Sequence, residues 1–219
     1  KNAKAYVRGV RESGLAVCCK HFPGDGIEEL DQHLVMGVNT MECDEWDSTF
    51  GHVYKEMIDS GIQSIMAGHI ALPEYSRKLR PGIKDEDIMP ATLAPELITD
   101  LLRGKLGFNG LVLTDASHMA GMTAAMPRSQ QVPGAIAAGC DMFLFFNDIE
   151  EDFCYMMDGY RNGIITEERL TDALRRILGL KASLKLHEKK KKGTLIPEKE
   201  GLSVVGCAEH LAMAAEAAK

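Results

Sequence analysis

Ionisable side chains gather directly after four short apolar runs of the sequence. The runs cover residues 15–19, 62–67, 111–114 and 141–146, and the side chains that follow them include Lys20, His21, His69, Asp115 and Asp148. A carboxylate can act as a nucleophile, and an imidazole can exchange protons near neutral pH. If the four runs end at one place in the fold, these residues can perform acid–base and nucleophilic chemistry there.

A second group lies on the stretch that follows the first run. Asp31 and His33 stand two residues apart among glycine and acidic residues. In an extended loop, side chains at positions i and i+2 point the same way, so one substrate could meet both. A neighbouring carboxylate fixes the tautomer of an imidazole and supports its protonated form. We expect this loop to swing in and complete the site.

The elements that must position these residues follow from the hydrophobic pattern. The four runs are nearly continuous in hydrophobicity, which is typical of strands buried on both faces of a parallel sheet. Between them, apolar residues repeat with helical spacing through 50–58, Pro95 opens a helix that Gly107 can cap, and Thr166 can cap a third helix. Alternating strands and helices predict a parallel α/β fold.

The choice within this class is between an open sheet and a closed barrel. No glycine-rich GxGxxG or Walker-type loop follows a strand, which argues against a nucleotide-binding open sheet. Polar residues at the ends of successive strands are typical of the active site of a (β/α)8 barrel of the TIM type. About four strand–helix units are visible, whereas a whole barrel needs roughly 250 residues. The sequence therefore predicts roughly the C-terminal half of such a barrel.

The sequence also predicts a division of the chain. Residues 1–180 carry the strand–helix pattern and are expected to form the C-terminal part of the catalytic barrel, with an unclosed apolar side. The lysine-rich composition after Leu180 predicts a basic linker and the start of a further helix over 181–219. Because the chain begins without Met, we expect its true N-terminus to be missing.

Composition excludes several classes of partner. With 25 Lys and Arg against 32 Asp and Glu, the net charge is −7, so the chain lacks the positive field that nucleic acid binding needs. No apolar run approaches the roughly 18 residues of a membrane span. The six cysteines show no CxxC spacing and are expected to be free thiols in a reducing compartment, which favours a cytoplasmic location.

Three stretches resemble the signature of glycoside hydrolase family 3, and most closely its β-N-acetylglucosaminidase branch. They are Lys20–Gly26 with the Asp31-Gln32-His33 triplet after it, Pro90–Pro95, and Leu106–Asp115. The pattern of the branch is Lys-His-Phe-Pro-Gly followed by an Asp-x-His pair. The resemblance covers most of residues 1–180 in the order and spacing of the family, and the three stretches together are highly specific.

The resemblance implies the catalytic roles. Asp115 aligns with the nucleophile, which forms a covalent glycosyl intermediate in a retaining glycosidase. Most glycosidases use a second carboxylic acid as proton donor, but this branch uses a histidine paired with an aspartate two residues earlier. His33 and Asp31 fit that pattern, so His33 is expected to protonate the departing oxygen with the support of Asp31.

The resemblance also implies contacts with the sugar. Lys20 and His21 correspond to residues that hydrogen-bond sugar hydroxyls. His69 is expected at the same end of the barrel, where it either contacts substrate or supports the site through hydrogen bonds. Met119 is expected to pack beside the sugar or in the core. Asp25 stands where many members carry histidine, and no role is assigned to it.

The implied reaction is the hydrolysis of terminal β-N-acetylglucosaminides, such as peptidoglycan-derived muropeptides, without a cofactor. One alternative is a β-glucosidase or β-xylosidase, although those relatives usually take the acid from a Glu on a following domain and lack the Asp-x-His loop. Another is a phosphorylase, because a neutral donor repels an incoming anion less than a carboxylate does. The family's upstream sugar-binding Asp and Arg residues have no counterpart here. We therefore expect the rest of the protein, or a partner chain, to supply the missing barrel half.

Two readings from other classes remain open. The histidines and aspartates at the strand ends could belong to a metal-dependent barrel hydrolase. A turn and a mobile loop separate these residues, which is poor preorganisation for a metal, so no metal site is assigned. A half-barrel binding protein that has lost its chemistry is the other reading, and the presence of Asp115 together with Asp31 and His33 argues against it.

Overall fold

The computed structural model describes residues 2–196 and 198–218 and divides the chain into two compact units. The first unit is Lys1–Leu180 and the second is Lys181–Lys219. All six cysteines are free thiols, as predicted. Among the described helices, none combines the length and the apolar character that crossing a membrane requires.

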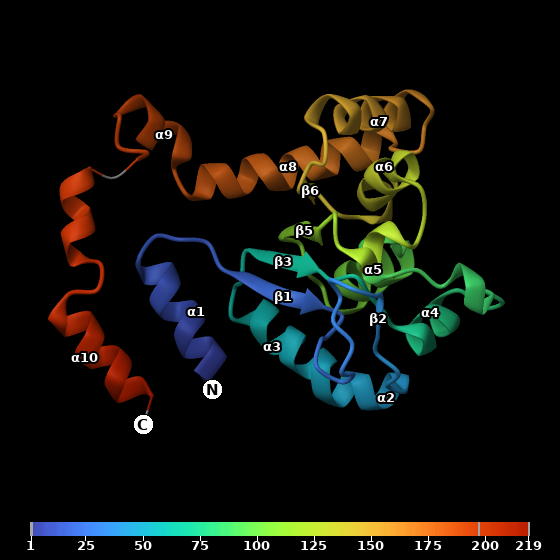
Figure 1. Cartoon of the computed structure of the whole chain (residues 1–219), viewed down its shortest axis with the longest axis horizontal. Coiled ribbons are helices and arrows are strands. Elements are labelled where there is room, and N and C mark those ends of the chain that lie inside the picture. The colour runs from blue at the N-terminus through green and yellow to red at the C-terminus, as the bar shows by residue number, and fades with distance from the viewer. Residues whose placement is uncertain (1, 197, 219) are drawn as a thin grey trace. The chain divides into compact units, whose positions relative to one another are not determined.

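The first unit alternates strands with helices (Figure 1). Its elements are α1 (Asn2–Glu12), β1 (Cys18–Phe22), β2 (Gly37–Val38), α2 (Cys43–Trp46), the π-helix η1 (Asp47–Gly51), α3 (His52–Asp59), β3 (Ser64–Ala67), β4 (Ile70–Ala71), α4 (Pro73–Leu79), the 3₁₀-helices η2 (Asp85–Asp87) and η3 (Ala91–Leu93), the π-helix η4 (Glu96–Lys105), β5 (Leu111–Ala116), α5 (Ala120–Thr123), α6 (Arg128–Ala138), β6 (Met142–Leu144), α7 (Ile149–Arg161) and α8 (Glu167–Ser183), which runs on past the end of the unit. The second unit contains α9 (Leu186–Lys191), the 3₁₀-helix η5 (Lys199–Val204) and α10 (Ala208–Ala217).

Four parallel strands form the main sheet, in the order β1-β3-β5-β6 (Figure 1). Strands β3 and β5 pair without a shift in register, from Ser64 opposite Leu111 to Ala67 opposite Thr114. A second sheet of two short parallel strands joins β2 to β4. The prediction of a parallel α/β arrangement is confirmed, and the carboxyl ends of β1, β3 and β5 lie at one end of the sheet.

The first strand lies further along the chain than the hydrophobic run predicted. It covers Cys18–Phe22 rather than 15–19, so Lys20 and His21 lie within the strand. Pairing with β3 decides its position, because Cys18 and Cys19 lie opposite the amino end of β3 while Phe22 lies opposite Ala67. Phe22 is fully buried, whereas Leu15 is 61% exposed. Tertiary pairing thus outweighs local hydrophobicity here.

The three helices expected from periodicity are present, and two of them are partly or wholly π-helical: the stretch 50–58 begins in η1 and continues as α3. Thr166 caps α8, since its Oγ1 accepts a hydrogen bond from the backbone N–H of Arg169 at 3.2 Å. The helix after Pro95 is the π-helix η4, in which the N–H of Leu106 donates to the carbonyl of Leu101. Gly107 ends it with φ +75°, a conformation that glycine adopts without steric cost.

An aromatic cluster supports the turn that follows β1. Phe22, Trp46 and Tyr75 are buried, and Trp46 packs edge-on against both other rings. The Trp46 indole N–H donates to the carbonyl of Pro23 at 2.8 Å. This bond fixes the turn after β1 to the core and thereby sets the direction in which the following loop leaves the sheet.

The outer side of β6 is apolar and open, as expected for an unclosed barrel. Phe145 and Phe146 are each more than half exposed directly after β6. A cavity of about 650 Å³ beside them is lined by apolar side chains of β6, α7 and α8. Among the described strands, β1 and β6 each pair with one neighbour only, so both edges of the sheet are available for further strands.

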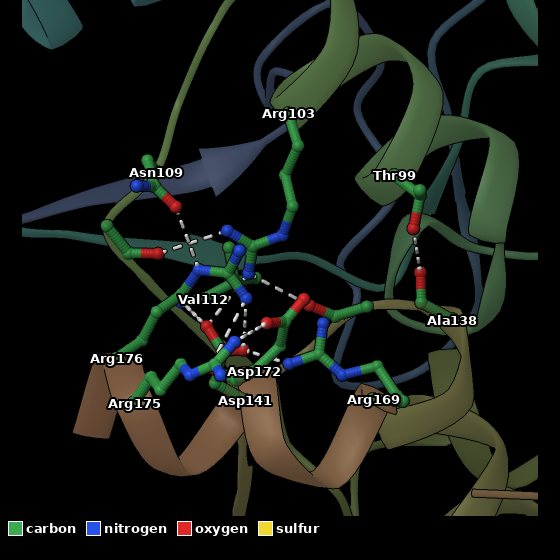
Figure 2. Close-up of polar contacts among 12 residues, drawn as sticks. Thr99, Arg103, Asn109, Val112, Ala138, Asp141, Arg169, Asp172, Arg175 and Arg176 are labelled. Carbon is green, nitrogen blue, oxygen red and sulfur yellow. Dashed lines mark hydrogen bonds and ion pairs between the residues drawn. The ribbon is translucent and has the colours of Figure 1, made fainter. Parts of the chain in front are cut away.

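A buried carboxylate ties β5, β6, η4 and α8 together at the amino end of the strands. Asp141 is fully buried and accepts hydrogen bonds from Arg103 Nη2 at 2.8 Å and from the N–H of Val112 at 2.9 Å. Arg169 and Arg176 on α8 contact its other oxygen (Figure 2). Each carboxylate oxygen therefore holds two partners, which compensates for the removal of the charge from water.

This cluster predicts a large and local effect on stability. We expect Asp141→Asn to lower the free energy of unfolding by about 3–5 kcal/mol, because three partly buried guanidinium groups lose the charge that balances them. The control is Asp172→Asn on α8, the helix that carries Arg169 and Arg176. Asp172 is half exposed and pairs with Arg175, so we expect its loss to lower the free energy of unfolding by less than about 1 kcal/mol. Urea unfolding followed by Trp46 fluorescence measures both, and equal losses would contradict the assignment.

Candidate active site

His21 and Asp115 meet at the carboxyl end of the sheet. His21 is on β1 and Asp115 on β5, and His21 Nε2 lies 3.3 Å from Asp115 Oδ2. Strand β3 lies between these strands, and Gly68 follows it directly. A Cβ at Gly68 would lie 3.0 Å from the Cβ of His21, so the absence of a side chain there leaves the room that the histidine occupies. Two residues 94 positions apart thus share one site.

Asp115 contacts the backbone with one carboxylate oxygen and the His21 ring with the other. Its side chain is 15% exposed, and Oδ1 accepts a hydrogen bond from the backbone N–H of Ala116 at 2.7 Å. Oδ2 faces His21. Within residues 2–196 and 198–218, no Lys or Arg forms an ion pair with it. A partly buried carboxylate without a cationic partner retains the electron pair that a nucleophile needs.

His21 lies between two carboxylates, since its Nδ1 is 3.4 Å from Asp25 Oδ2. Burial is the main reason that the pKa of His21 is lowered, and Lys20 lowers it further, while Asp115 and Asp25 oppose the shift. The ring is therefore neutral at pH 7 and carries one N–H. It can donate to one carboxylate at a time and leaves the other nitrogen as an acceptor, which suits the binding of a hydroxyl group.

His69 is fully buried directly after Gly68, and both of its ring nitrogens contact protein groups. Nε2 lies 3.0 Å from the carbonyl oxygen of Ala116, so it must carry the proton, and Nδ1 lies 2.9 Å from Thr92 Oγ1. Burial lowers the pKa of His69, which keeps the ring neutral. This geometry favours a role in holding Ala116, the residue after Asp115, over direct contact with substrate.

The two other expected sugar contacts differ in exposure. Lys20 is exposed on β1, where its ammonium group is available to a ligand. Met119 is only 4% exposed, and its N–H donates to the carbonyl of Ala116 at 3.1 Å. Of the two roles considered for Met119, the structure favours packing inside the protein.

Asp31 and His33 form a pair on a tight turn. His33 Nδ1 lies 2.6 Å from Asp31 Oδ1, and the same oxygen accepts the backbone N–H of His33 at 2.9 Å. The expected extended loop is therefore wrong, because the N–H of Leu34 donates to the carbonyl of Asp31 and closes a turn. The aspartate aligns the histidine ring through this Asx-type turn instead of through the alternation of an extended chain.

The environment of the pair is aqueous. Asp31 is 58% and His33 72% exposed. Hydrogen bonds from the backbone N–H and then the ring of His33 lower the pKa of Asp31, so the carboxylate is ionised at neutral pH. In the described part of the chain, no hydrogen bond or ion pair joins this pair to Asp115, and the proposed motion of the loop stays a prediction.

Sequence reasoning missed two residues that organise the site. Gln32, between Asp31 and His33, is 6% exposed and donates from Nε2 to Asp25 Oδ2 at 2.8 Å. Arg128 donates to Ser117 in the loop after β5 and to the carbonyl of Phe145 in the loop after β6, and it pairs with the buried Asp152 on α7. Neither shows a signal in the sequence, because a polar residue in a loop looks the same whether it is buried or solvated. Among the described residues, no group of three or more His, Cys, Asp and Glu could hold a metal ion.

Comparison with known proteins gives the family. The model of the glycosyl hydrolase family 3 N terminal domain matches residues 1–180. The chain belongs to glycosyl hydrolase family 3. The resemblance stated from the sequence motifs is thereby confirmed.

Named relatives are enzymes that act on β-glycosides. The chain is 54% identical over 213 residues to a β-N-acetylglucosaminidase/β-glucosidase of Cellulomonas fimi. The aligned region covers 97% of this chain and 37% of the relative. It is 32% identical to a β-hexosaminidase of Methylobacillus flagellatus over 66% of this chain and 38% of the relative. The chain thus spans less than two fifths of the length of these relatives.

Solved structures agree with the fold. The β-glucoside phosphorylase BglX is 45% identical, with a TM-score of 0.86 over 89% of this chain and 35% of that protein. A family 3 β-N-acetylglucosaminidase from Paenibacillus sp. str. FPU-7 is 28% identical, with a TM-score of 0.75 over 84% of this chain and 34% of that protein. The N-terminal domain of the family is a TIM-barrel-type fold, and the four parallel strands described here form part of such a barrel.

Proposed function

We propose that this chain forms the catalytic part of a retaining glycosidase that cleaves terminal β-N-acetylglucosaminides. The observation that carries the proposal is the placement of Asp115 beside His21 at the carboxyl end of the sheet, partly buried and, within the described residues, without a Lys or Arg partner. Support comes from the Asp31–His33 pair on the adjoining loop. Asp115 is the nucleophile, His33 the acid and base, and Asp31 its orienting partner.

The first step forms the covalent intermediate. Asp115 attacks the anomeric carbon, the bond to the leaving oxygen breaks, and protonated His33 gives its proton to that oxygen. The carboxylate of Asp31 stabilises the imidazolium before the transfer and holds the ring in place. Lys20 and His21 bind the sugar hydroxyls and keep the anomeric carbon within reach of Asp115.

The second step releases the sugar. Neutral His33 takes a proton from a water molecule, the water oxygen attacks the anomeric carbon, and the bond to Asp115 breaks. Retention of configuration follows because two displacements occur at the same carbon. The histidine returns to its protonated form and the carboxylate to its ionised form.

A second candidate is a phosphorolytic reaction on the same intermediate. It is supported by the 45% identity to the β-glucoside phosphorylase BglX, which exceeds the 28% identity to the β-N-acetylglucosaminidase structure from Paenibacillus named above. In that reaction a phosphate oxygen attacks the anomeric carbon in place of water, the bond to Asp115 breaks, and the product is a sugar 1-phosphate. A neutral imidazole repels the incoming anion less than a second carboxylate would.

The active protein also needs the strands that complete the barrel. The chain covers about a third of the phosphorylase and of the relatives named above, and the apolar side beside β6 is open. We include in the proposal that the rest of the protein, or a partner chain, supplies these strands. The experiments below therefore use the enzyme with its barrel complete.

The acid role of His33 predicts a dependence on the leaving group. In His33→Ala, kcat/KM for a substrate with a poor leaving group should fall about 10²–10⁴-fold, because that oxygen leaves only when protonated. A 2,4-dinitrophenyl glycoside needs no acid and should be cleaved at nearly the original kcat/KM. His52→Ala, which removes an exposed histidine on α3, is the matched control. Equal losses on both substrates would contradict the role.

Paired aryl substrates test both which acceptor is used, water or phosphate, and which sugar is preferred. We expect a higher kcat/KM for the aryl β-N-acetylglucosaminide than for the aryl β-glucoside, and free sugar as product in phosphate buffer. If the product is a sugar 1-phosphate, the enzyme is a phosphorylase, which is the second candidate function. A preference for the glucoside would move the substrate assignment to the β-glucosidase class while leaving Asp115 as nucleophile.

A further inference from the structure

Gln32 is buried although it lies between two exposed residues. Asp31 and His33 are 58% and 72% exposed, whereas Gln32 is 6% exposed. The side chain of Gln32 therefore points into the protein while its neighbours point to solvent. A glutamine amide offers two donors and one acceptor, and burying it stabilises the fold only when hydrogen bonds replace those to water.

Both ends of this amide are used. Nε2 donates to Asp25 Oδ2 at 2.8 Å, and Oε1 accepts the backbone N–H of His69 at 2.9 Å. Asp25 in turn lies 3.4 Å from His21, whose other nitrogen faces Asp115. A continuous path of polar contacts thus runs from the nucleophile, through the residue that binds the sugar, to the loop that carries the acid.

The backbone of the same turn is fastened to the segment after β5. The N–H of Gly121 donates to the carbonyl of Gln32, and the N–H of Ala120 donates to the carbonyl of His33, each at 3.2 Å. A Cβ at Gly121 would lie 3.0 Å from the Gln32 carbonyl oxygen, and one at Gly68 would lie 3.1 Å from Gln32 Oε1. The absence of side chains at Gly68 and Gly121 therefore lets the turn with Gln32 pack against these two segments.

We propose that Gln32, through its bond to Asp25, is a positioning residue that sets the place of His33 relative to Asp115. The inference rests on the proposed acid role of His33 and adds to it the residue that holds the loop. Its physical reason is the steep dependence of proton transfer on geometry, because a misplacement of about 1 Å can cost about 10²-fold in rate.

The test compares two leaving groups in the complete enzyme. Gln32→Ala should lower kcat/KM for a substrate with a poor leaving group by about 10–100-fold. It should change kcat/KM for a 2,4-dinitrophenyl glycoside by less than about threefold, because that substrate needs no acid catalysis. Glu29→Gln, an exposed position on the same loop, is the matched control and should change neither value. His33→Ala is measured in parallel as the reference for complete loss of the acid.

A second pair of variants keeps the shape of the side chain. Gln32→Glu replaces the donor by an acceptor and sets it against Asp25, so it should show the same selective loss. Adding Asp25→Asn supplies a donor from the other side and should recover at least part of the lost kcat/KM on the poor leaving group. Such recovery requires the contact itself and excludes a general loss of folding.

The outcomes distinguish a failure of the positioning role of Gln32 from a failure of the acid role of His33. If His33→Ala shows the selective loss and Gln32→Ala does not, the positioning role is overturned and the acid role stands. If Gln32→Ala lowers both substrates equally, or if the double variant recovers nothing, Gln32 is a structural residue only. If His33→Ala itself shows no selective loss, the acid assignment fails and the positioning role fails with it.

Discussion

The absence of a side chain at Gly68 is the constraint on which the site depends. His21 and Asp115 sit on strands that β3 separates, and the end of β3 must leave room for one to reach the other. Parallel pairing in one sheet brings these strand ends together, and Gly68 then lets the imidazole approach the carboxylate to 3.3 Å. The same glycine leaves space for the amide of Gln32, so the His21–Asp115 contact and the loop that carries the Asp31–His33 pair both depend on the missing side chain at Gly68.

Much of the fold could be predicted from the sequence because it follows from local pattern. Continuous apolar runs with helices between them specified parallel strands, and Thr166 and Gly107 marked helix ends correctly. The position of β1 could not be predicted from the run that contains Leu15, because pairing with β3 places the strand three positions further along the chain, at Cys18–Phe22. The buried cluster at Asp141 was also invisible, since its arginines come from η4 and α8 and meet only in the folded chain.

The residues of the candidate site also fall into two groups: those that the sequence indicates and those whose roles depend on contacts in the folded chain. The sequence indicated Asp115 and His21 as candidates because motif and strand ends both mark them, and the Asp31–His33 pair because its spacing is distinctive; their catalytic roles stay predictions. The turn that joins that pair, and the roles of Gln32 and Asp25, depend on contacts between the loop, β3 and α5 that no local pattern encodes. His69 was placed at the correct end of the sheet, but only its contacts with Ala116 and Thr92 distinguish support from substrate binding.

The central claim is that one carboxylate becomes bonded to the sugar. The most direct measurement is to trap that intermediate with a fluorinated sugar carrying an activated leaving group and to locate the adduct by peptide mass spectrometry. We predict the label on Asp115, and no label in Asp115→Asn. An adduct on another residue, such as Asp25 on the other side of the His21 ring, or continued turnover by Asp115→Asn would contradict the account.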